Sequence, residues 1–147
     1  MLLVKEITSK DVDLCFEFDL ITISLWTKKQ WESELRKDGI KVFGLFLSDL
    51  VIGICSIQII LDEVQINFFA INNNFRRNGF GTLMMKHLFS ISKKLKIKKI
   101  LLEVSKTNSV AENFYSHFNF CTVGIRKNVY KDGSDALLKE KKLIKKL

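Results

Sequence analysis

The sequence contains no proline among its 147 residues, so one of the usual signals for the ends of helices and strands is missing. It also lacks any run approaching the roughly 18 consecutive apolar residues that a membrane span requires. The apolar segment at residues 2–4 is too short for a signal peptide. Together these absences predict a cytoplasmic protein that makes no contact with a membrane.

Cysteine is scarce, and its pattern excludes two kinds of stabilisation. The three residues, Cys15, Cys55 and Cys121, are odd in number and widely spaced, with no CxxC pair and no histidine cluster beside them. A disulfide framework and a structural zinc site are therefore not expected. Because each lies among apolar neighbours, we predict three reduced, buried thiols and no metal site.

Length and composition favour one globular unit. Hydrophobic residues at 47% and charged residues at 27% are close to the averages of soluble proteins, which argues against global disorder. A chain of 147 residues is of the usual size for one domain. No internal repeat or low-complexity linker interrupts it, so we predict a single domain over residues 1–147.

The net charge of +8 favours anionic partners. Two interpretations are open: a nucleic-acid-binding protein, or a soluble enzyme with a polyanionic ligand and a lysine-rich end. The basic residues are dispersed and no nucleic-acid motif accompanies them, so we expect no direct nucleic-acid binding. The densest basic run, residues 139–146, is predicted to be a mostly solvated terminus.

Hydrophobic spacing predicts alternating strands and helices. Apolar and β-branched segments indicate strands at residues 2–7, 41–47, 50–60, 63–71, 98–105, 121–126 and 136–141. Capping residues indicate helices after residues 8–11 and after Thr27, and a short helix is expected at 110–117. The segment 63–71 is rich in Ile and Phe, as expected for a strand buried on both faces.

The clearest amphipathic helix begins at Gly79. Its expected buried face consists of Leu83, Met84, Leu88, Ile91 and Leu95. A strand precedes this helix and another follows it, so the two strands should run parallel. The sequence thus predicts an α/β fold.

A glycine motif opens that helix. Arg76-x-x-Gly79-x-Gly81 would leave free N–H groups at a helix start, where glycine lets an anion approach closely and the helix dipole favours negative charge. A diphosphate would fit there, although a tight strand-to-helix turn explains the same residues. A dinucleotide fold would need three glycines in GxGxxG and a later acidic residue, and the third glycine is absent.

The motif resembles the acetyl-CoA signature (Arg/Gln)-x-x-Gly-x-(Gly/Ala) of the GNAT superfamily of N-acetyltransferases. The segments 101–108 and 111–120 are similar to that family's second half, LEV-x-x-x-N…A-x-x-x-Y-x-x-x-GF. Within the superfamily, Glu103, Asn108, Tyr115 and the stretch 125–130 resemble the RimI branch, the ribosomal-protein alanine N-acetyltransferases.

The resemblance implies a mixed, mostly antiparallel twisted sheet with a central splayed pair of parallel strands, flanked by helices. It implies acetyl-CoA as co-substrate, with its pyrophosphate at the glycine motif and its pantetheine arm along the backbone of residues 69–71. The implied cofactor-binding residues are Phe69, Ala70, Ile71, Arg76, Arg77, Asn78, Gly79, Phe80, Gly81, Thr82 and Asn108.

Two catalytic roles follow from the resemblance. Glu103, a carboxylate in an apolar strand whose unpaired burial would be costly, would be the general base. Tyr115 would be the general acid that protonates the departing thiolate. Structural alternatives stay open at this point: Glu103 pairs with a cation, Tyr115 is a core aromatic, and Asn108 caps a helix.

The implied acceptor is a protein N-terminal amine, with the N-terminal alanine of a small-subunit ribosomal protein as the favoured case. An α-amine has a pKa of about 7.7–8.0, against about 10.4 for lysine, and is the easier nucleophile near neutral pH. Acetylation of a small-molecule amine or a lysine side chain is a second hypothesis. A non-catalytic CoA-sensing or RNA-binding module is a third.

Overall fold

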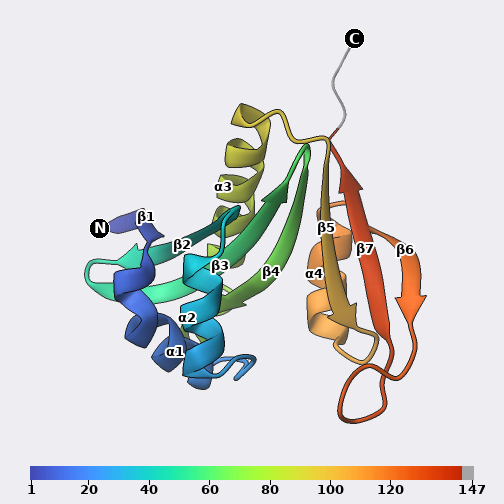
Figure 1. The fold of residues 1–147 in the computed structure, drawn as a ribbon, viewed down its shortest axis with the longest axis horizontal. Helices are drawn as coiled ribbons and strands as arrows, with labels where there is room; N and C mark the ends of the chain where they lie inside the picture. Colours follow the sequence, from blue (N-terminus) through green and yellow to red (C-terminus); the bar gives the residue numbers. More distant parts are fainter. Residues whose placement is uncertain (144–147) are drawn as a thin grey trace.

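The computed structural model describes residues 1–143, which form one seven-stranded sheet in the order β1-β2-β3-β4-β5-β7-β6 (Figure 1). The strands are β1 (Leu2–Ile7), β2 (Ile40–Leu47), β3 (Leu50–Ile60), β4 (Glu63–Ile71), β5 (Lys99–Ser105), β6 (Cys121–Arg126) and β7 (Ala136–Lys142). Neighbouring strands are antiparallel except for the parallel pair β4 and β5. The predicted mixed, mostly antiparallel sheet is confirmed.

Within residues 1–143, four α-helices cover the sheet. They are α1 (Val12–Leu20), α2 (Lys28–Arg36), α3 (Phe80–Lys94) and α4 (Ser109–His117), with single 3₁₀ turns at η1 (Ser9–Asp11) and η2 (Asn73–Phe75). The capping box predicted before α2 is present: the Thr27 hydroxyl accepts from the N–H of Gln30, and the Gln30 side chain accepts from the N–H of Thr27. Among the described residues no helix is long and apolar enough to cross a membrane.

Two cores lie on opposite faces of the sheet. Helices α1 and α2 bury Trp31 against Phe68, with ring centroids 4.9 Å apart. Helices α3 and α4 pack on the other face, where Met84 and Leu88 are fully buried. The predicted face of α3 was partly wrong. Its ends, Leu83 and Leu95, are exposed, whereas Met85 and Ser92, which lie one residue after Met84 and Ile91, are buried instead.

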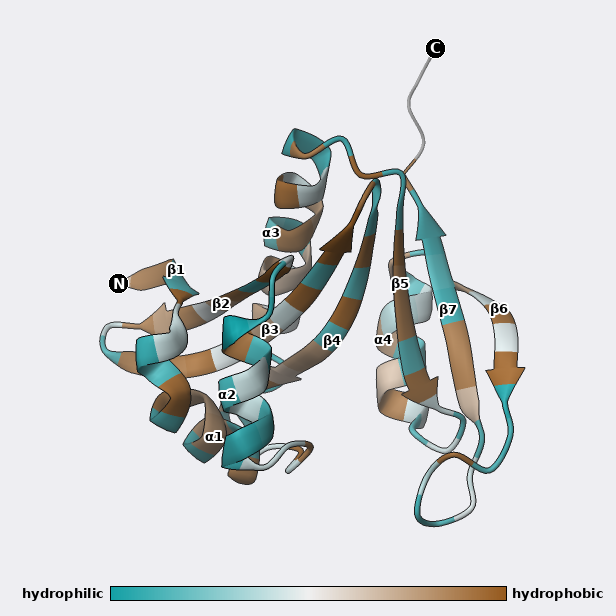
Figure 2. Cartoon of the chain, in the orientation of Figure 1, coloured by the Kyte–Doolittle hydropathy of each residue, from teal (hydrophilic) through white to brown (hydrophobic). Residues whose placement is uncertain are grey.

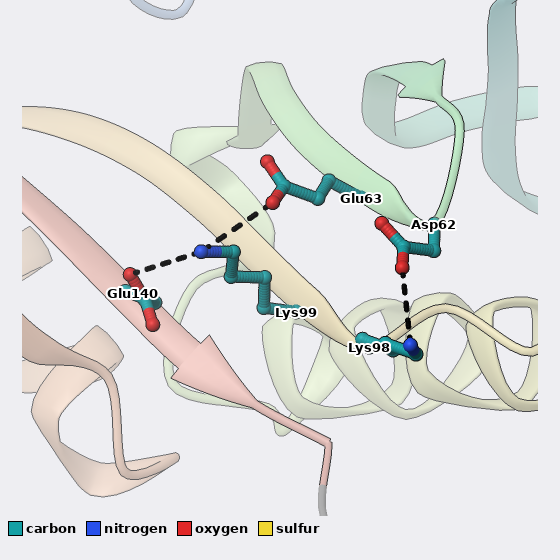
Figure 3. A network of polar contacts seen from close by, with 5 residues as sticks. All are labelled: Asp62, Glu63, Lys98, Lys99 and Glu140. Atoms are coloured by element: carbon teal, nitrogen blue, oxygen red, sulfur yellow. Dashed lines mark ion pairs between the residues drawn. The ribbon is translucent and has the colours of Figure 1, made fainter.

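The parallel pair separates along its length. Register between β4 and β5 covers residues 63–65 and 99–101, although both strands continue beyond it. Figure 1 shows the two ribbons diverging from that end, as the resemblance implied. At the paired end the Nζ of Lys99 lies 3.4 Å from Oε2 of Glu63 and 3.9 Å from Oε2 of Glu140 (Figure 3). These ion pairs connect β4, β5 and β7 where the sheet is still continuous.

A bulge interrupts β4 just beyond the residues that pair with β5. Ser56 of β3 is opposite Phe68 and Ile57 is opposite Ile66, so Asn67 is an extra residue. The bulge exchanges the two faces: Ile66 packs towards α3, whereas Phe68 packs towards α2. The expectation of a strand buried on both faces is confirmed only in part. Residues of β4 pack into both cores, but buried residues alternate with partly exposed ones and Gln65 is exposed.

The basic C-terminal segment is structured up to Lys142 rather than solvated. Lys139 is 3% exposed and its Nζ donates to the Thr122 hydroxyl at 3.0 Å, while the Nζ of Lys141 donates to the Phe118 carbonyl at 2.9 Å. Strand alternation sends these two lysines towards α4, and Figure 2 shows the hydrophilic C-terminal half of β7. Residues 144–147 of the basic run lie outside the described part.

Two of the three predicted buried thiols are confirmed. Cys15 and Cys55 are fully buried, but Cys121 is exposed. Cys121 begins β6, an edge strand of the sheet in which every residue is exposed or partly exposed.

Candidate functional site

The start of α3 offers unsatisfied backbone donors. Gly79 is the N-cap with φ +78°, and Arg77 before it also has positive φ, at +66°. Within residues 1–143 no oxygen accepts from the N–H groups of residues 79–82, because the first turn of a helix has no partner for them. The side chain of Asn78 donates to the carbonyls of Phe75 and Arg76 and so fixes the turn. Such a helix start suits a phosphate group.

The two glycines of the motif have different surroundings. A Cβ at Gly79 would have no heavy atom within 4 Å, whereas a Cβ at Gly81 would lie 3.2 Å from the Phe114 ring. Gly81 therefore lets α3 approach α4, a packing role that the glycine motif alone does not indicate. Gly79 is the position where an approaching ligand would meet open space. Arg76 and Arg77 are exposed beside it.

The backbone of β4 presents hydrogen-bonding groups where β5 has diverged. The N–H of Asn72 donates to the Ile52 carbonyl at 2.8 Å, which fixes the antiparallel pattern between β3 and β4. In that pattern the groups of Ala70 face β3, while the N–H and C=O groups of Phe69 and Ile71 face away from it. Of the three predicted backbone positions, Phe69 and Ile71 therefore present their peptide groups on the side where β5 has separated from β4.

Tyr115 lies beside this backbone. Its side chain is 8% exposed and packs against the rings of Phe69, Phe114 and Phe120 at centroid distances of 6.2, 5.4 and 5.7 Å. Burial, with a smaller effect from Cys55, raises the pKa of the phenol, so the hydroxyl remains protonated at neutral pH. No described residue hydrogen-bonds to that hydroxyl within 1–143. The ring is a core aromatic, and its hydroxyl is free to donate.

Glu103 is paired and partly exposed rather than buried. Arg126 Nη1 donates to its Oε1 at 2.6 Å, and the two side chains are 55% and 33% exposed. Alternation along β5 turns Glu103 away from Leu102 and Val104, which pack in the core with Tyr115. Glu103 and Tyr115 therefore lie on opposite faces of the sheet, and a group held between β4 and β5 would lie between them.

Asn108 has the helix-capping role that was its structural alternative. It is the N-cap of α4, and its Oδ1 accepts from the N–H of Ala111 at 3.1 Å. The cap places the start of α4, the helix that carries Tyr115. The histidines take no part in a cluster: among the described residues no group of three His, Cys, Asp or Glu side chains could hold a metal ion.

Arg126 was not identified as a site residue from the sequence. Its contact with Glu103 crosses β7, since Glu103 is opposite Leu138 and Leu138 is opposite Gly124. Tyr130 also lies near the pair. Burial raises its pKa first, the Glu103 charge raises it further, and Arg126 opposes the shift. The available sequence signal was the stretch 125–130, which the resemblance had already included.

The chain matches a family model described as the acetyltransferase (GNAT) family over residues 7–120. It is 30% identical over 138 residues to a Bacillus subtilis (strain 168) protein named as a putative ribosomal protein bS18-alanine N-acetyltransferase, covering 92% of this chain and 91% of that protein. It is 26% identical to the ribosomal protein bS18-alanine N-acetyltransferase of Escherichia coli (strain K12), covering 71% and 70% of the two chains.

Solved structures show the same fold. The ribosomal-protein-S18-alanine N-acetyltransferase of Escherichia coli superposes with a TM-score of 0.88 at 23% identity, over 95% of this chain and 92% of that one. Ard1 from Thermoplasma volcanium gives a TM-score of 0.86 at 22% identity, over 98% and 99% of the two chains.

Proposed function

Because this chain belongs to the acetyltransferase (GNAT) family, we propose that it transfers an acetyl group from acetyl-CoA to the α-amine of a protein N-terminus. The favoured acceptor is the N-terminal alanine of a small-subunit ribosomal protein, since two similar proteins are named for that reaction on bS18. We also propose that residues 1–147 form one acetyltransferase domain acting in the cytoplasm.

The observation that carries the proposal is that Glu103 and Tyr115 lie on opposite faces of the sheet, where β4 and β5 have separated. The N–H groups of residues 79–82 suit the pyrophosphate, and the N–H and C=O groups of Phe69 and Ile71 suit the amides of the pantetheine arm. A thioester carbonyl held by such a backbone N–H is polarised, as in an oxyanion hole. The acyl carbon would then lie between Glu103 and Tyr115.

Glu103 and Tyr115 each transfer one proton in this mechanism. Glu103 takes a proton from the acceptor ammonium, directly or through a water, which frees the nitrogen lone pair for attack on the acyl carbon. As the carbon–sulfur bond breaks, Tyr115 donates its phenolic proton to the departing thiolate. Its raised pKa keeps that proton available. Since the two groups lie on opposite faces, the amine would approach from the Glu103 face while the thiol remains on the Tyr115 face.

The test is incubation with acetyl-CoA and a panel of peptides, read by mass spectrometry. The panel contains peptides with N-terminal Ala, peptides with other N-terminal residues, and N-terminally blocked peptides carrying lysine. We expect the acetyl group on the α-amine of the Ala peptides. Labelling of lysine or polyamines alone would indicate the second acceptor class. Calorimetric binding of CoA without transfer to any amine would indicate a non-catalytic module.

A further inference from the structure

A buried polar network joins α2 to the bulge of β4. Glu34 of α2 is 7% exposed, and its Oε2 accepts two hydrogen bonds, from the Ser56 hydroxyl at 2.8 Å and from the Asn67 side-chain amide at 2.9 Å. Among residues 1–143 no lysine, arginine or histidine forms an ion pair with it. A carboxylate removed from water without a cation is costly unless hydrogen bonds replace its hydration.

The two donors, Ser56 and Asn67, lie on different strands, and only Asn67 belongs to the bulge. Ser56 lies on the unbulged strand β3, opposite Phe68, and the register shift falls between it and Ile57. Asn67 is the extra residue of the bulge, and it immediately precedes the segment whose backbone faces the splay. A one-residue change of register in a strand turns its side chains to the other face and reverses which peptide groups face each neighbour. The bulge therefore determines that Phe69 and Ile71, and not Phe68 and Ala70, offer free N–H and C=O groups.

We propose that Glu34 is a positioning residue that holds the Asn67 bulge, and through it the backbone that binds and polarises the thioester. The inference depends on the proposed function, because it assigns a purpose to the same backbone. Helix α2 is well placed for this role. It also carries Trp31, whose ring centroid lies 4.9 Å from that of Phe68. The same helix therefore contacts the bulge residue Asn67 and the residue after it. No sequence motif singles out Glu34.

The main experiment compares Asn67→Ala with Ser56→Ala. Both variants remove one neutral donor from the same carboxylate oxygen, so they should lower the melting temperature by similar amounts. We expect Asn67→Ala to lower kcat/KM for acetyl-CoA by about tenfold to a hundredfold, since small displacements of a reacting group have effects of that size. Ser56→Ala should remain within about threefold of wild type, because it leaves the Asn67 bond in place.

A second pair tests the carboxylate itself. Both hydrogen bonds converge on one oxygen, and the amide of glutamine supplies one such oxygen. Glu34→Gln should therefore restore most of the activity that Glu34→Ala loses, even if its melting temperature is lower. Acetyl-CoA affinity, measured by calorimetry on folded variants, should follow the order wild type, Glu34→Gln, Glu34→Ala.

The outcomes separate this inference from the proposed function. If wild-type protein neither binds acetyl-CoA nor acetylates a peptide, the proposed function is wrong. If the wild type is active but Asn67→Ala and Ser56→Ala lose activity equally, in proportion to their loss of stability, then the network is structural and the inference is wrong. Equal activity of all four variants and wild type would also overturn it.

Discussion

Arg126 and Glu103 come from strands that are not neighbours, yet Arg126 Nη1 lies 2.6 Å from Glu103 Oε1. The strand between them, β7, has Leu138 in the intervening position, and Gly124 beside Leu138 has no side chain to obstruct the contact. One oxygen of the proposed base is therefore occupied by a guanidinium of the same chain. An acceptor ammonium would have to share or displace that contact.

Arg126→Met should lower the KM for an acceptor peptide, because it removes the cation that competes for the carboxylate. The pair is partly exposed, and such pairs contribute about 0.2–1 kcal/mol, so the decrease should be about 1.5-fold to fivefold. Steady-state kinetics at saturating acetyl-CoA measures it. Lys127→Met, a neighbouring change of the same charge, is the control. A higher KM in Arg126→Met alone would mean that the guanidinium orients Glu103 for catalysis.

Glu103→Gln should lower kcat/KM most at low pH. An α-amine with a pKa of about 7.7–8.0 is largely protonated at pH 6.5 and needs a base, whereas at pH 9 most of it is already neutral. The ratio of wild-type to variant kcat/KM should therefore shrink as the pH rises. Glu140→Gln, which changes a carboxylate of β7 that contacts Lys99, is the control. A ratio independent of pH would remove the role of base.

The order of helices and strands was largely predictable from the sequence, because capping residues such as Thr27 and the change of hydrophobic period are local signals. The bulge was not, since Asn67 lies in an apolar run that looks the same with or without an extra residue. The Arg126–Glu103 contact was not predictable either. It requires β7 to lie between β5 and β6, which spacing alone does not determine.

In the basic C-terminal strand, a charged side chain is not necessarily an exposed one. Lys139 and Lys141 lie in a run that looks solvated, but in a strand alternate residues share a face. Their long apolar stems run along the core side while each ammonium reaches an oxygen, of Thr122 or of Phe118. The composition of this run indicates its positive charge, but it does not indicate that Lys139 and Lys141 are covered. The pairing of β7 with β5 decided which lysines were covered.

Gly79→Asp should weaken acetyl-CoA binding by about fivefold or more relative to Gly79→Asn. Both side chains tolerate the positive φ of this position and can cap a helix, so they differ mainly in charge. A carboxylate near the pyrophosphate costs about 1 kcal/mol even in water. Calorimetry at about 0.1 M and about 1 M salt measures both affinities, and the difference should shrink at high salt. Equal affinities at low salt would place the pyrophosphate elsewhere.

Alkaline pH should destabilise the fold. Burial, and then the charges of Asp11 and Asp19, raise the pKa of Cys15 from 9.0 to about 12. Between these values the unfolded thiol loses its proton while the folded one keeps it, so the free energy of unfolding falls as the pH rises. The slope is about 1.4 kcal/mol per pH unit for one group. Denaturant unfolding at pH 8 and pH 10 measures it, and Cys15→Ala should reduce the decrease. If the free energy of unfolding of Cys15→Ala fell with pH as steeply as that of the wild type, Cys15 would not be the group responsible.

Tyr115→Phe should lower kcat by a factor of about 10² to 10⁴ if the phenol supplies the proton to the thiolate. Burial raises its pKa above the ordinary value of about 10, so the defect should stay constant from pH 7 to pH 10, unlike that of Glu103→Gln. Acetyl-CoA affinity should change little, because the ring remains packed on Phe69 and Phe120. Tyr130→Phe, the chain's other phenol, is the control. A Tyr115→Phe protein that keeps full turnover and an unchanged melting temperature would leave Tyr115 with neither a catalytic nor a packing role for its hydroxyl.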